Sequence, residues 1–152
     1  WKGSKITGDQ HTGQIFAKSS SIQVTDGVIT SGEIVFDMAS FTVTDLEGEW
    51  KTKFLGHMKS PDFFDVAKFP TATLKVRDFK KGRIAGDLTI KGVTQTISFP
   101  VRTVDGKYMG KTTFDRTKFG MTYGSGSFFK NLGDKLINDA VEVEFTIALK
   151  GK

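Results

Sequence analysis

The chain has 152 residues, of which 38% are apolar and 26% are charged, and its formal net charge is +5. This length favours a single domain over residues 1–152 that buries roughly 70% of the surface exposed by the unfolded chain. Since no apolar run approaches the ~20 residues of a membrane span, we expect no integral membrane segment. The chain contains no cysteine, which excludes disulfides, thiolate nucleophiles and cysteine-ligated metals.

Phenylalanine supplies most of the aromatic surface, with 14 Phe against 2 Trp and 2 Tyr. Because the Phe ring has no polar group, this usage suits an apolar interior or an apolar ligand better than a wet recognition surface. A core rich in Phe explains it more simply. The lysines and arginines are scattered along the chain, and the scarcity of Tyr and Trp disfavours a base-stacking platform, so we expect no nucleic-acid partner.

Short alternating segments separated by glycines predict an all-β barrel. The opening run Lys2–Lys18 contains three glycines and predicts one strand that is bent or bulged at them. Further along, Ile34, Phe36 and Met38 share one face of a strand.

The rest of the chain repeats the pattern, with strands expected over 72–79, 83–91, 93–101 and 141–149. We expect Pro100 to mark an edge or strand end. Four dipeptides supply the positive φ angles of tight hairpin turns: Asp26-Gly27, Lys81-Gly82, Lys91-Gly92 and Asp105-Gly106. The count is about eight strands, and an eight-stranded barrel just holds its own side chains or one small ligand.

The segment between Asp45 and Pro70 departs from this pattern. Trp50, Phe54 and Met58 follow one another at i, i+4 and i+8, which predicts an amphipathic helix with Asp45 as its N-cap.

A second short helix is expected directly afterwards, because Ser60-Pro61-Asp62 combines an N-cap, a proline at the first helical position and a favourable acidic charge. Pro70 ends it. Helical segments inserted between barrel strands have to lie over an open end. The sequence therefore predicts a helical insert near one end of the barrel, containing Phe63, Phe64 and Phe69.

A second irregular segment, residues 116–135, combines glycines with the aromatic side chains of Phe119, Tyr123, Phe128 and Phe129. If both irregular aromatic segments lie at the same end of the barrel, they frame the mouth of a pocket. The glycines around Tyr123 could also present backbone N–H groups to an anion, although a flexible connection is the simpler interpretation.

Catalytic patterns are weak throughout. The two imidazoles, His11 and His57, have no sequence partner that predicts a catalytic triad, and no GxSxG motif occurs. A metal site that combines them with Asp9 or Asp62 lacks the usual ligand spacing. We expect no catalytic residues, no metal and no cofactor.

Paired acids occur as Asp62/Asp65 and as Glu142/Glu144. The first pair is explained by the preference of helix N-termini for negative charge, and the second by the exposed face of a strand. Neither pair specifies the inward-facing carboxylates that glycoside hydrolysis requires.

Several ordered segments resemble the YceI family of bacterial polyisoprenoid-binding, lipocalin-like proteins. The resemblance runs from Trp1 to Leu149 and rests on the following stretches: WKGSKITGDQHTG, GEIVFDMAS, HMKSPDFFDVAKFPTAT, GDLTIKGVTQTISFPV and DRTKFGMTYGSG followed by DKLINDAVEVEF. The chain has Ala67 and Ala140 where the family commonly has an acidic residue, and both are expected on the surface.

The resemblance implies an eight-stranded antiparallel lipocalin-like barrel around an apolar channel. It further implies a long-chain lipid ligand, such as a polyprenyl phosphate, a quinone or a fatty acid derivative. A periplasmic or secreted location, with a removed export signal, and a possible homodimer are also implied. The sequence does not exclude a cytoplasmic location.

From the strand pattern and this resemblance we predict two groups of ligand-binding residues, about half of the first being plain core. The candidates for the channel wall are Phe36, Phe54, Met58, Phe63, Phe64, Phe69, Leu88, Ile90, Phe99, Phe114, Phe119 and Phe145. The candidates for a headgroup site are His57, Lys59, Ser60, Arg116 and Tyr123.

Three functions remain open. The first is binding, sequestration or transport of a long-chain amphiphilic lipid. The second is a stress-related or interaction protein of the same fold whose barrel is filled by its own side chains. The third, a lipid-modifying hydrolase or isomerase, lacks a recognisable base and nucleophile.

Overall fold

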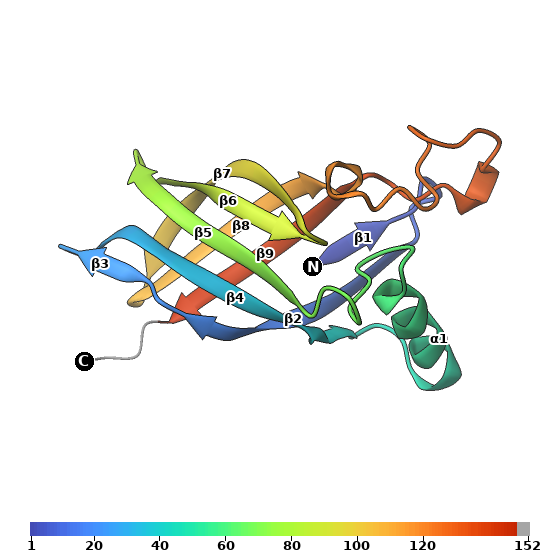
Figure 1. Cartoon of the computed structure of the whole chain (residues 1–152), viewed down its shortest axis with the longest axis horizontal. Coiled ribbons are helices and arrows are strands. Elements are labelled where there is room, and N and C mark those ends of the chain that lie inside the picture. Colours follow the sequence, from blue (N-terminus) through green and yellow to red (C-terminus); the bar gives the residue numbers. More distant parts are fainter. Residues whose placement is uncertain (149–152) are drawn as a thin grey trace.

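The computed structural model describes residues 1–148 (Figure 1). The first half of the chain contains β1 (Lys2–Ser4), β2 (Gln10–Ser20), β3 (Gln23–Thr25), β4 (Val28–Val43) and helix α1 (Gly48–Lys59). The second half contains β5 (Thr71–Lys80), β6 (Arg83–Ile90), β7 (Val93–Val104), β8 (Lys107–Asp115), the 3₁₀ segments η1 (Arg116–Phe119) and η2 (Gly133–Lys135), and β9 (Ala140–Ala148).

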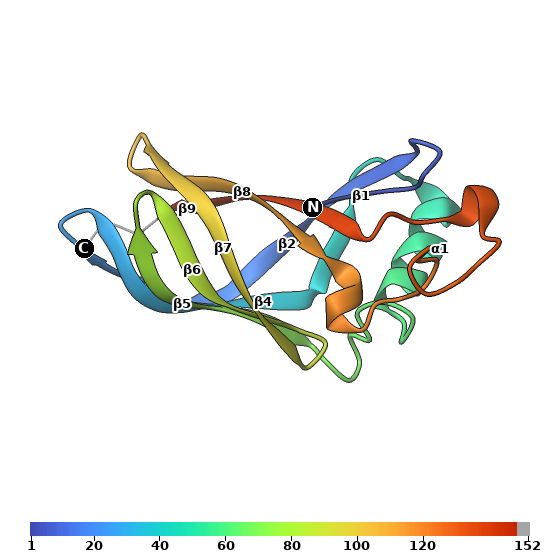
Figure 2. The same ribbon diagram turned by 90° about the horizontal axis from the view of Figure 1, so that it is seen from above.

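Eight of these strands form a closed ring. The order is β2-β1-β9-β8-β7-β6-β5-β4, and β4 pairs back with β2, so that the sheet closes into a barrel. Neighbouring strands are antiparallel, and β3 adds a short hairpin to the end of β4. Helix α1 and the loop that contains η2 lie at the same end of the barrel in both views (Figures 1 and 2). The predicted eight-stranded barrel with a helical insert near one end is confirmed.

The hairpin turns follow the local sequence. In all four predicted dipeptides both residues have positive φ angles, for example 51° at Lys81 and 72° at Gly82. Two consecutive positive φ angles define the type I′ turn, whose twist matches that of the flanking strands. These turns set the register, and with it which side chains of each strand face the interior.

The alternation within strands also agrees with the sequence. In β7, Phe99 and Val101 are buried, and Ser98 and Pro100 on the alternate positions are exposed. Pro100, however, does not end the strand. It is the last residue of β7 paired with β6, and pairing with β8 begins at Val101. The last residue of the predicted strand 141–149 lies outside the described residues.

The opening run is two strands rather than one bent strand. A turn at residues 5–9 reverses the chain, with hydrogen bonds from Lys5 N to Asp9 O (2.7 Å) and from Gly8 N to Lys5 O (3.0 Å). As a result β1 and β2 pair with each other, and Gly3 lies opposite His11.

The helical insert is shorter than predicted. Helix α1 begins at Gly48 with Glu47 as its N-cap, while the carboxylate of Asp45 instead accepts a hydrogen bond from Thr12 N (2.9 Å). The expected second helix is absent from the described chain: residues 60–70 form consecutive turns, because Asp65 has a left-handed φ of 47° that interrupts a helical repeat.

Strand β1 is too short to separate β2 and β9 along their full lengths. Within residues 1–148, residues 14–20 of β2 form strand pairings only with β4, and residues 143–148 of β9 form strand pairings only with β8. The barrel therefore has a lateral seam, along which β2 and β9 of the described chain are not paired with each other or with β1.

Candidate functional site

The barrel encloses a cavity of about 1110 Å³ that runs between its two core clusters. Toward the end away from α1 its walls include Ile29, Ile84 and Phe99. Toward α1 they include Met38 and Ala72. In β5, β6 and β7 the inward side chains come from alternate positions, as the period-2 pattern of strands requires, whereas β4 changes parity between Ile29 and Met38. Together the four strands place one apolar surface inside.

A buried tyrosine packs in the core cluster at the end of the barrel away from α1. Tyr108 on β8 is buried, and its hydroxyl donates a hydrogen bond of 2.9 Å to the carbonyl oxygen of Gly27, in the turn before β4. Ile29 and Val101 pack beside it in the same cluster. A buried tyrosine with a satisfied hydroxyl can stabilise this end of the barrel without leaving a polar group unpaired.

Aromatic rings line the part of the cavity next to α1. Trp1 stacks on Phe41 with ring centroids 4.8 Å apart and on Phe54 of α1 with centroids 6.1 Å apart. Phe41 in turn contacts Phe64 at 5.2 Å. Gly13 makes room for this arrangement, because a Cβ atom at that position would lie 2.6 Å from the indole ring of Trp1.

His57 joins three segments at this end. Its ring packs edge-on against Phe63 (5.1 Å) and against Tyr123 (4.6 Å), and its Nε2 atom lies 3.1 Å from a carboxylate oxygen of Asp62. The interaction therefore connects α1, the turns of residues 60–70 and the loop after η1. All three aromatic residues line the cavity.

Arg116 organises the irregular segment that follows β8. Its side chain is 3% exposed and donates hydrogen bonds of 2.8–3.1 Å to four backbone carbonyls, those of Met121, Tyr123, Ile137 and Asn138. Burial lowers the pKa of Arg116, and the negative charges of Asp139 and Asp115 act in the opposite direction. With four of its five N–H groups committed to the backbone, the guanidinium has little left for a ligand headgroup.

The carboxylate of Asp139 balances this buried charge. Its Oδ2 atom accepts a hydrogen bond of 2.7 Å from the Ser127 hydroxyl, and its buried Oδ1 atom lies 3.7 Å from Nη2 of Arg116. Burial acts to raise the pKa of Asp139. The neighbouring Ser125 and Ser127 hydroxyls and the charge of Arg116 outweigh that effect, so the pKa lies below its ordinary value.

Most of the predicted wall residues line this cavity. They are Phe36, Phe54, Met58, Phe63, Phe64, Leu88, Ile90, Phe99, Phe114 and Phe145. Phe119 instead packs in the core against Phe114, at 5.6 Å, and Phe69 packs against Gly92. Contact of any of these residues with a ligand stays a prediction.

The predicted headgroup residues divide in the same way. His57, Arg116 and Tyr123 line the cavity, whereas Lys59 and Ser60 do not. The ammonium of Lys59 donates to the carbonyl of Ala39 at 2.8 Å, and the hydroxyl of Ser60 donates to the carbonyl of His57 at 2.6 Å. Both polar groups thus stabilise the backbone around α1.

Sequence reasoning missed several wall residues. Ile34 and Met38 share a strand face with Phe36, and the same alternation could have selected them. Trp1 and Phe41 carried no comparable signal, because their contact depends on how the first residues cross β4. Two lysines at the cavity mouth, Lys5 and Lys135, were missed for a similar reason.

Chemistry other than binding has little support in residues 1–148. His11 pairs with Asp45 at 2.8 Å and His57 with Asp62, but neither ring forms a hydrogen bond with a serine or threonine hydroxyl in this part of the chain. Nor do its His, Asp and Glu side chains assemble in threes that could hold a metal ion. Of the helices described, none has the length and apolar character needed to cross a membrane.

Comparison with known structures shows the same fold. The YCEI protein of Campylobacter jejuni superposes with a TM-score of 0.66 at 16% identity, covering 91% of this chain and 85% of that one. BcnA of Burkholderia cenocepacia gives a TM-score of 0.63 at 22% identity, covering 84% of this chain and 80% of that one.

Sequence comparison adds more local matches. UPF0312 proteins of Staphylococcus aureus strains N315 and Mu50 are each 40% identical over 45 residues, which is 30% of this chain. The chain spans only 26% of the length of these relatives. A model of the YceI-like domain, in contrast, matches residues 2–149. With nearly its whole length matched, and with the barrel of that family, the chain belongs to the YceI-like family.

Proposed function

We propose that this protein binds and carries a long-chain amphiphilic lipid, such as a polyisoprenoid or a fatty-acid derivative, in its barrel cavity. The observation that carries the proposal is the cavity of about 1110 Å³, whose interior walls are aliphatic and aromatic. Ligand pockets for drug-sized molecules commonly have volumes of about 300–1,000 Å³. This one is large enough for a long chain.

Such a cavity can supply affinity without many directional contacts. Each methylene removed from water contributes about 0.8 kcal/mol, so about ten of them contribute roughly 8 kcal/mol before the cost of ordering the ligand. That value corresponds to a dissociation constant near 1 μM. Chain length and cavity shape would then determine which lipids are retained.

The two other functions have less support. A barrel filled by its own side chains would not keep an open apolar volume of this size, because protein interiors are packed as densely as organic crystals. A lipid hydrolase or isomerase would need a nucleophile beside its base. The pairs His11–Asp45 and His57–Asp62 are explained more simply as contacts that position the two imidazole rings than as parts of a catalytic site.

The proposal also includes a location and an assembly state. A carrier of this kind would act in the periplasm or outside the cell, and could function as a monomer or a homodimer. Cell fractionation, followed by light scattering of the purified protein, tests both points.

The test of lipid binding uses a variant that fills the cavity. Ala72 is buried and lines the cavity, whereas the adjacent Thr71 on the same strand faces outward. We expect native mass spectrometry of protein purified from a bacterial host to show a bound mass of several hundred daltons, and extraction to identify it as a lipid. Ala72→Trp should abolish the bound mass, and Thr71→Trp should retain it.

A wild-type protein that is free of ligand under gentle conditions, and that takes up no added isoprenoid or fatty acid, would contradict the proposal. Equal lipid occupancy in wild type and Ala72→Trp would also contradict it, since the lipid would then bind elsewhere. Turnover of a labelled lipid would favour the enzymatic alternative.

A further inference from the structure

The end of the barrel that carries α1 exposes large apolar side chains. Trp50 on α1 is 73% exposed, Ile6 in the β1–β2 turn is 62% exposed, and Phe128 and Phe129 in the loop before η2 are 59% and 50% exposed. We call these four residues the apolar rim. Single exposed apolar residues are ordinary on protein surfaces, but four large ones at the same end of the barrel, three of them aromatic, make that end a candidate interaction surface.

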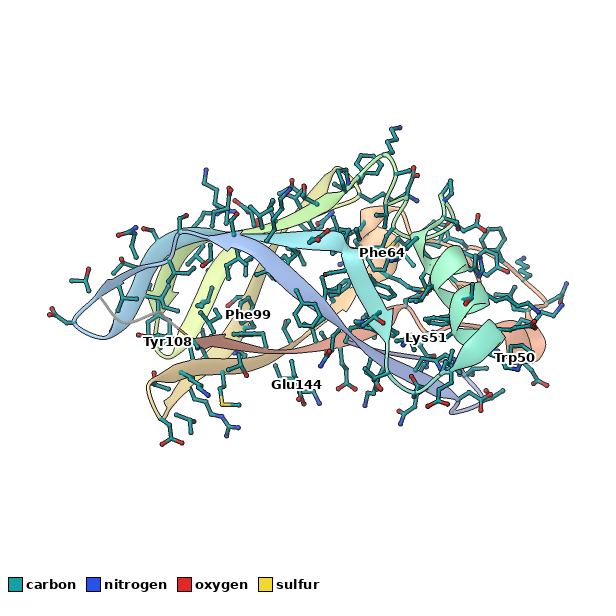
Figure 3. All side chains as sticks on the ribbon, turned by 90° about the horizontal axis from the view of Figure 1, so that it is seen from below. Trp50, Lys51, Phe64, Phe99, Tyr108 and Glu144 are labelled. Carbon is teal, nitrogen blue, oxygen red and sulfur yellow. The ribbon has the colours of Figure 1, made fainter. Side chains whose placement is uncertain are left out.

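The three segments of the apolar rim lie at one end of the molecule. Figures 1 and 2 both place α1, the β1–β2 turn and the loop around η2 at the same end of the barrel. Direct contacts hold them there, since Ile6 N donates to the carbonyl of Leu136 at 3.0 Å and His57 packs against Tyr123. Figure 3 shows Trp50 at the outer side of α1.

Hydrogen bonds hold the two rim phenylalanines in place. The backbone N–H groups of Phe128 and Phe129 both donate to the carbonyl of Ser125, at 3.2 and 2.9 Å. Ser125 is itself fully buried, and its hydroxyl accepts a hydrogen bond from Ser127 N at 3.2 Å. A well-bonded turn therefore presents these rings to the outside.

Each segment of the apolar rim also carries a lysine next to its exposed apolar residue: Lys5, Lys51 and Lys130, with Lys135 close by in η2. Within residues 1–148, none of these four ammonium groups lies within 4 Å of a carboxylate. The acidic Glu49 on α1 is engaged by Lys53 at 3.9 Å. Exposed carboxylates lie in the same segments, at Asp9, Glu47 and Asp134. The exposed aromatic rings therefore have unpaired lysines beside them, together with a smaller number of acids.

We propose that the apolar rim docks onto the surface of an anionic lipid bilayer. Trp and Phe rings are favourable at the level of the lipid headgroups, and lysines near a bilayer gain attraction to anionic phosphates. A protein partner would also fit an apolar surface. The free lysines around the rim and the net charge of +5 favour the bilayer, because they complement its negative charge.

The four rim residues do not line the cavity themselves, but neighbouring residues at the same end do, so the docking proposal deepens the proposed function and rests on it. Lys5 and Lys135 line the cavity, and so does the partly exposed Tyr123. When the rim lies on a bilayer, the mouth of the cavity faces the headgroups. A lipid could then pass between bilayer and barrel without exposing its chain to water, which costs about 0.8 kcal/mol for each methylene.

Vesicle flotation tests the proposal, with phosphatidylcholine vesicles that either contain or lack phosphatidylglycerol. We expect the protein to float with the anionic vesicles and to be released by salt. The triple variant Trp50→Ser, Phe128→Ser and Phe129→Ser should lose binding by about tenfold or more. Each of Lys51→Gln and Lys130→Gln should weaken binding to anionic vesicles by about fivefold, with little effect on neutral ones.

The matched control changes exposed apolar residues at the other end of the barrel. Val28 and Val104 are exposed and lie beside the hairpin turns there, and Val28→Ser with Val104→Ser should leave vesicle binding unchanged. Brominated lipids should quench the fluorescence of the wild type more than that of Trp50→Phe, since Trp50 is then inserted among the headgroups.

Two outcomes overturn the proposal: no flotation with either type of vesicle, or equal flotation of the wild type and the triple variant. Native mass spectrometry of the same triple variant separates this proposal from the proposed function. If bound lipid is retained while flotation is unaffected by the substitutions, the docking surface is wrong and the carrier stands. If the protein floats with vesicles but neither contains nor takes up lipid, the docking surface is supported and its role in lipid exchange is contradicted.

Discussion

The rings of His57 and Tyr123 meet edge-on, with their centroids 4.6 Å apart and their planes at 89°. The contact joins α1 to the irregular segment after η1, two parts of the chain that are 66 residues apart. Since both rings line the cavity, this contact connects the two segments that cover its end.

Tyr123→Ala should loosen this end of the barrel. An edge-to-face aromatic pair contributes about 0.5–1.5 kcal/mol beyond its buried area, and Tyr123 makes a second contact with Phe63 at 5.5 Å. We expect a small loss of stability in chemical denaturation and faster release of a fluorescent lipid. Val104→Ala, at the opposite end, is the control. Unchanged release from Tyr123→Ala would mean that the ligand leaves by another route, such as the lateral seam.

Phe63 and Phe64 should respond differently to removal. Phe63 is buried among His57, Tyr123 and Arg116, so Phe63→Ala should cost about 3–5 kcal/mol of unfolding free energy. Phe64 is only partly buried, so Phe64→Ala should lower lipid retention more than it lowers the melting temperature.

Parallel thermal melts and native mass spectra of the two variants check this prediction. A loss of stability and retention in the same proportion for Phe64→Ala would show that this residue is part of the core and not of the ligand surface.

Arg116→Gln should destabilise the protein by about 3–5 kcal/mol, because it leaves several buried carbonyls and the carboxylate of Asp139 without their cation. Lysine keeps the charge but lacks the planar array of N–H groups, so Arg116→Lys should recover only part of this loss. Denaturant titration measures both variants. A change in lipid affinity with unchanged stability would instead identify Arg116 as a headgroup ligand.

Asp139 should make stability depend on pH in the acid range. Its pKa in the folded protein lies below the ordinary carboxyl value, so the unfolded chain binds a proton first as the pH falls. The stabilisation from the carboxylate is therefore complete above about pH 4 and is lost as the pH falls through the folded-state pKa.

Melting temperatures of wild type and Asp139→Asn, measured between neutral pH and about pH 3, check the sign. The difference between the two proteins should be largest at neutral pH and should shrink in acid. A constant difference across this range would refute a contribution from ionised Asp139.

The strands were predictable because the information that specifies them is local. The Lys81-Gly82 and Asp105-Gly106 turns have the backbone angles that their residue types favour, and alternation in β7 and β9 places Phe99 and Phe145 on the inner face. The insert was less predictable. The helix N-terminal pattern at Ser60 was not realised, because Ser60 instead ends α1, donating from its N–H and its hydroxyl to His57 O, and Asp65 has a left-handed φ.

The residues of the candidate site were likewise predictable only where local sequence information specifies them. Most of the predicted wall residues line the cavity, but Phe69 and Phe119, which were also predicted, do not. A pattern along one segment does not show which side of an irregular loop faces the interior. Arg116 was predicted as a headgroup residue because it flanks an aromatic segment. Its actual partners are carbonyls at residues 121, 123, 137 and 138, which only the folded loop brings together.

The amino-acid sequence alone determined a β-barrel, its main hairpins and a supply of inward-facing apolar rings, because strand periodicity and turn preferences act between near neighbours in the chain. The tertiary structure decided that the interior is hollow, that Trp1 stacks on Phe41 and Phe54, and that Trp50 is exposed on the outer side of α1. These features depend on how segments that are distant in sequence pack against one another, and a local sequence pattern does not contain that information.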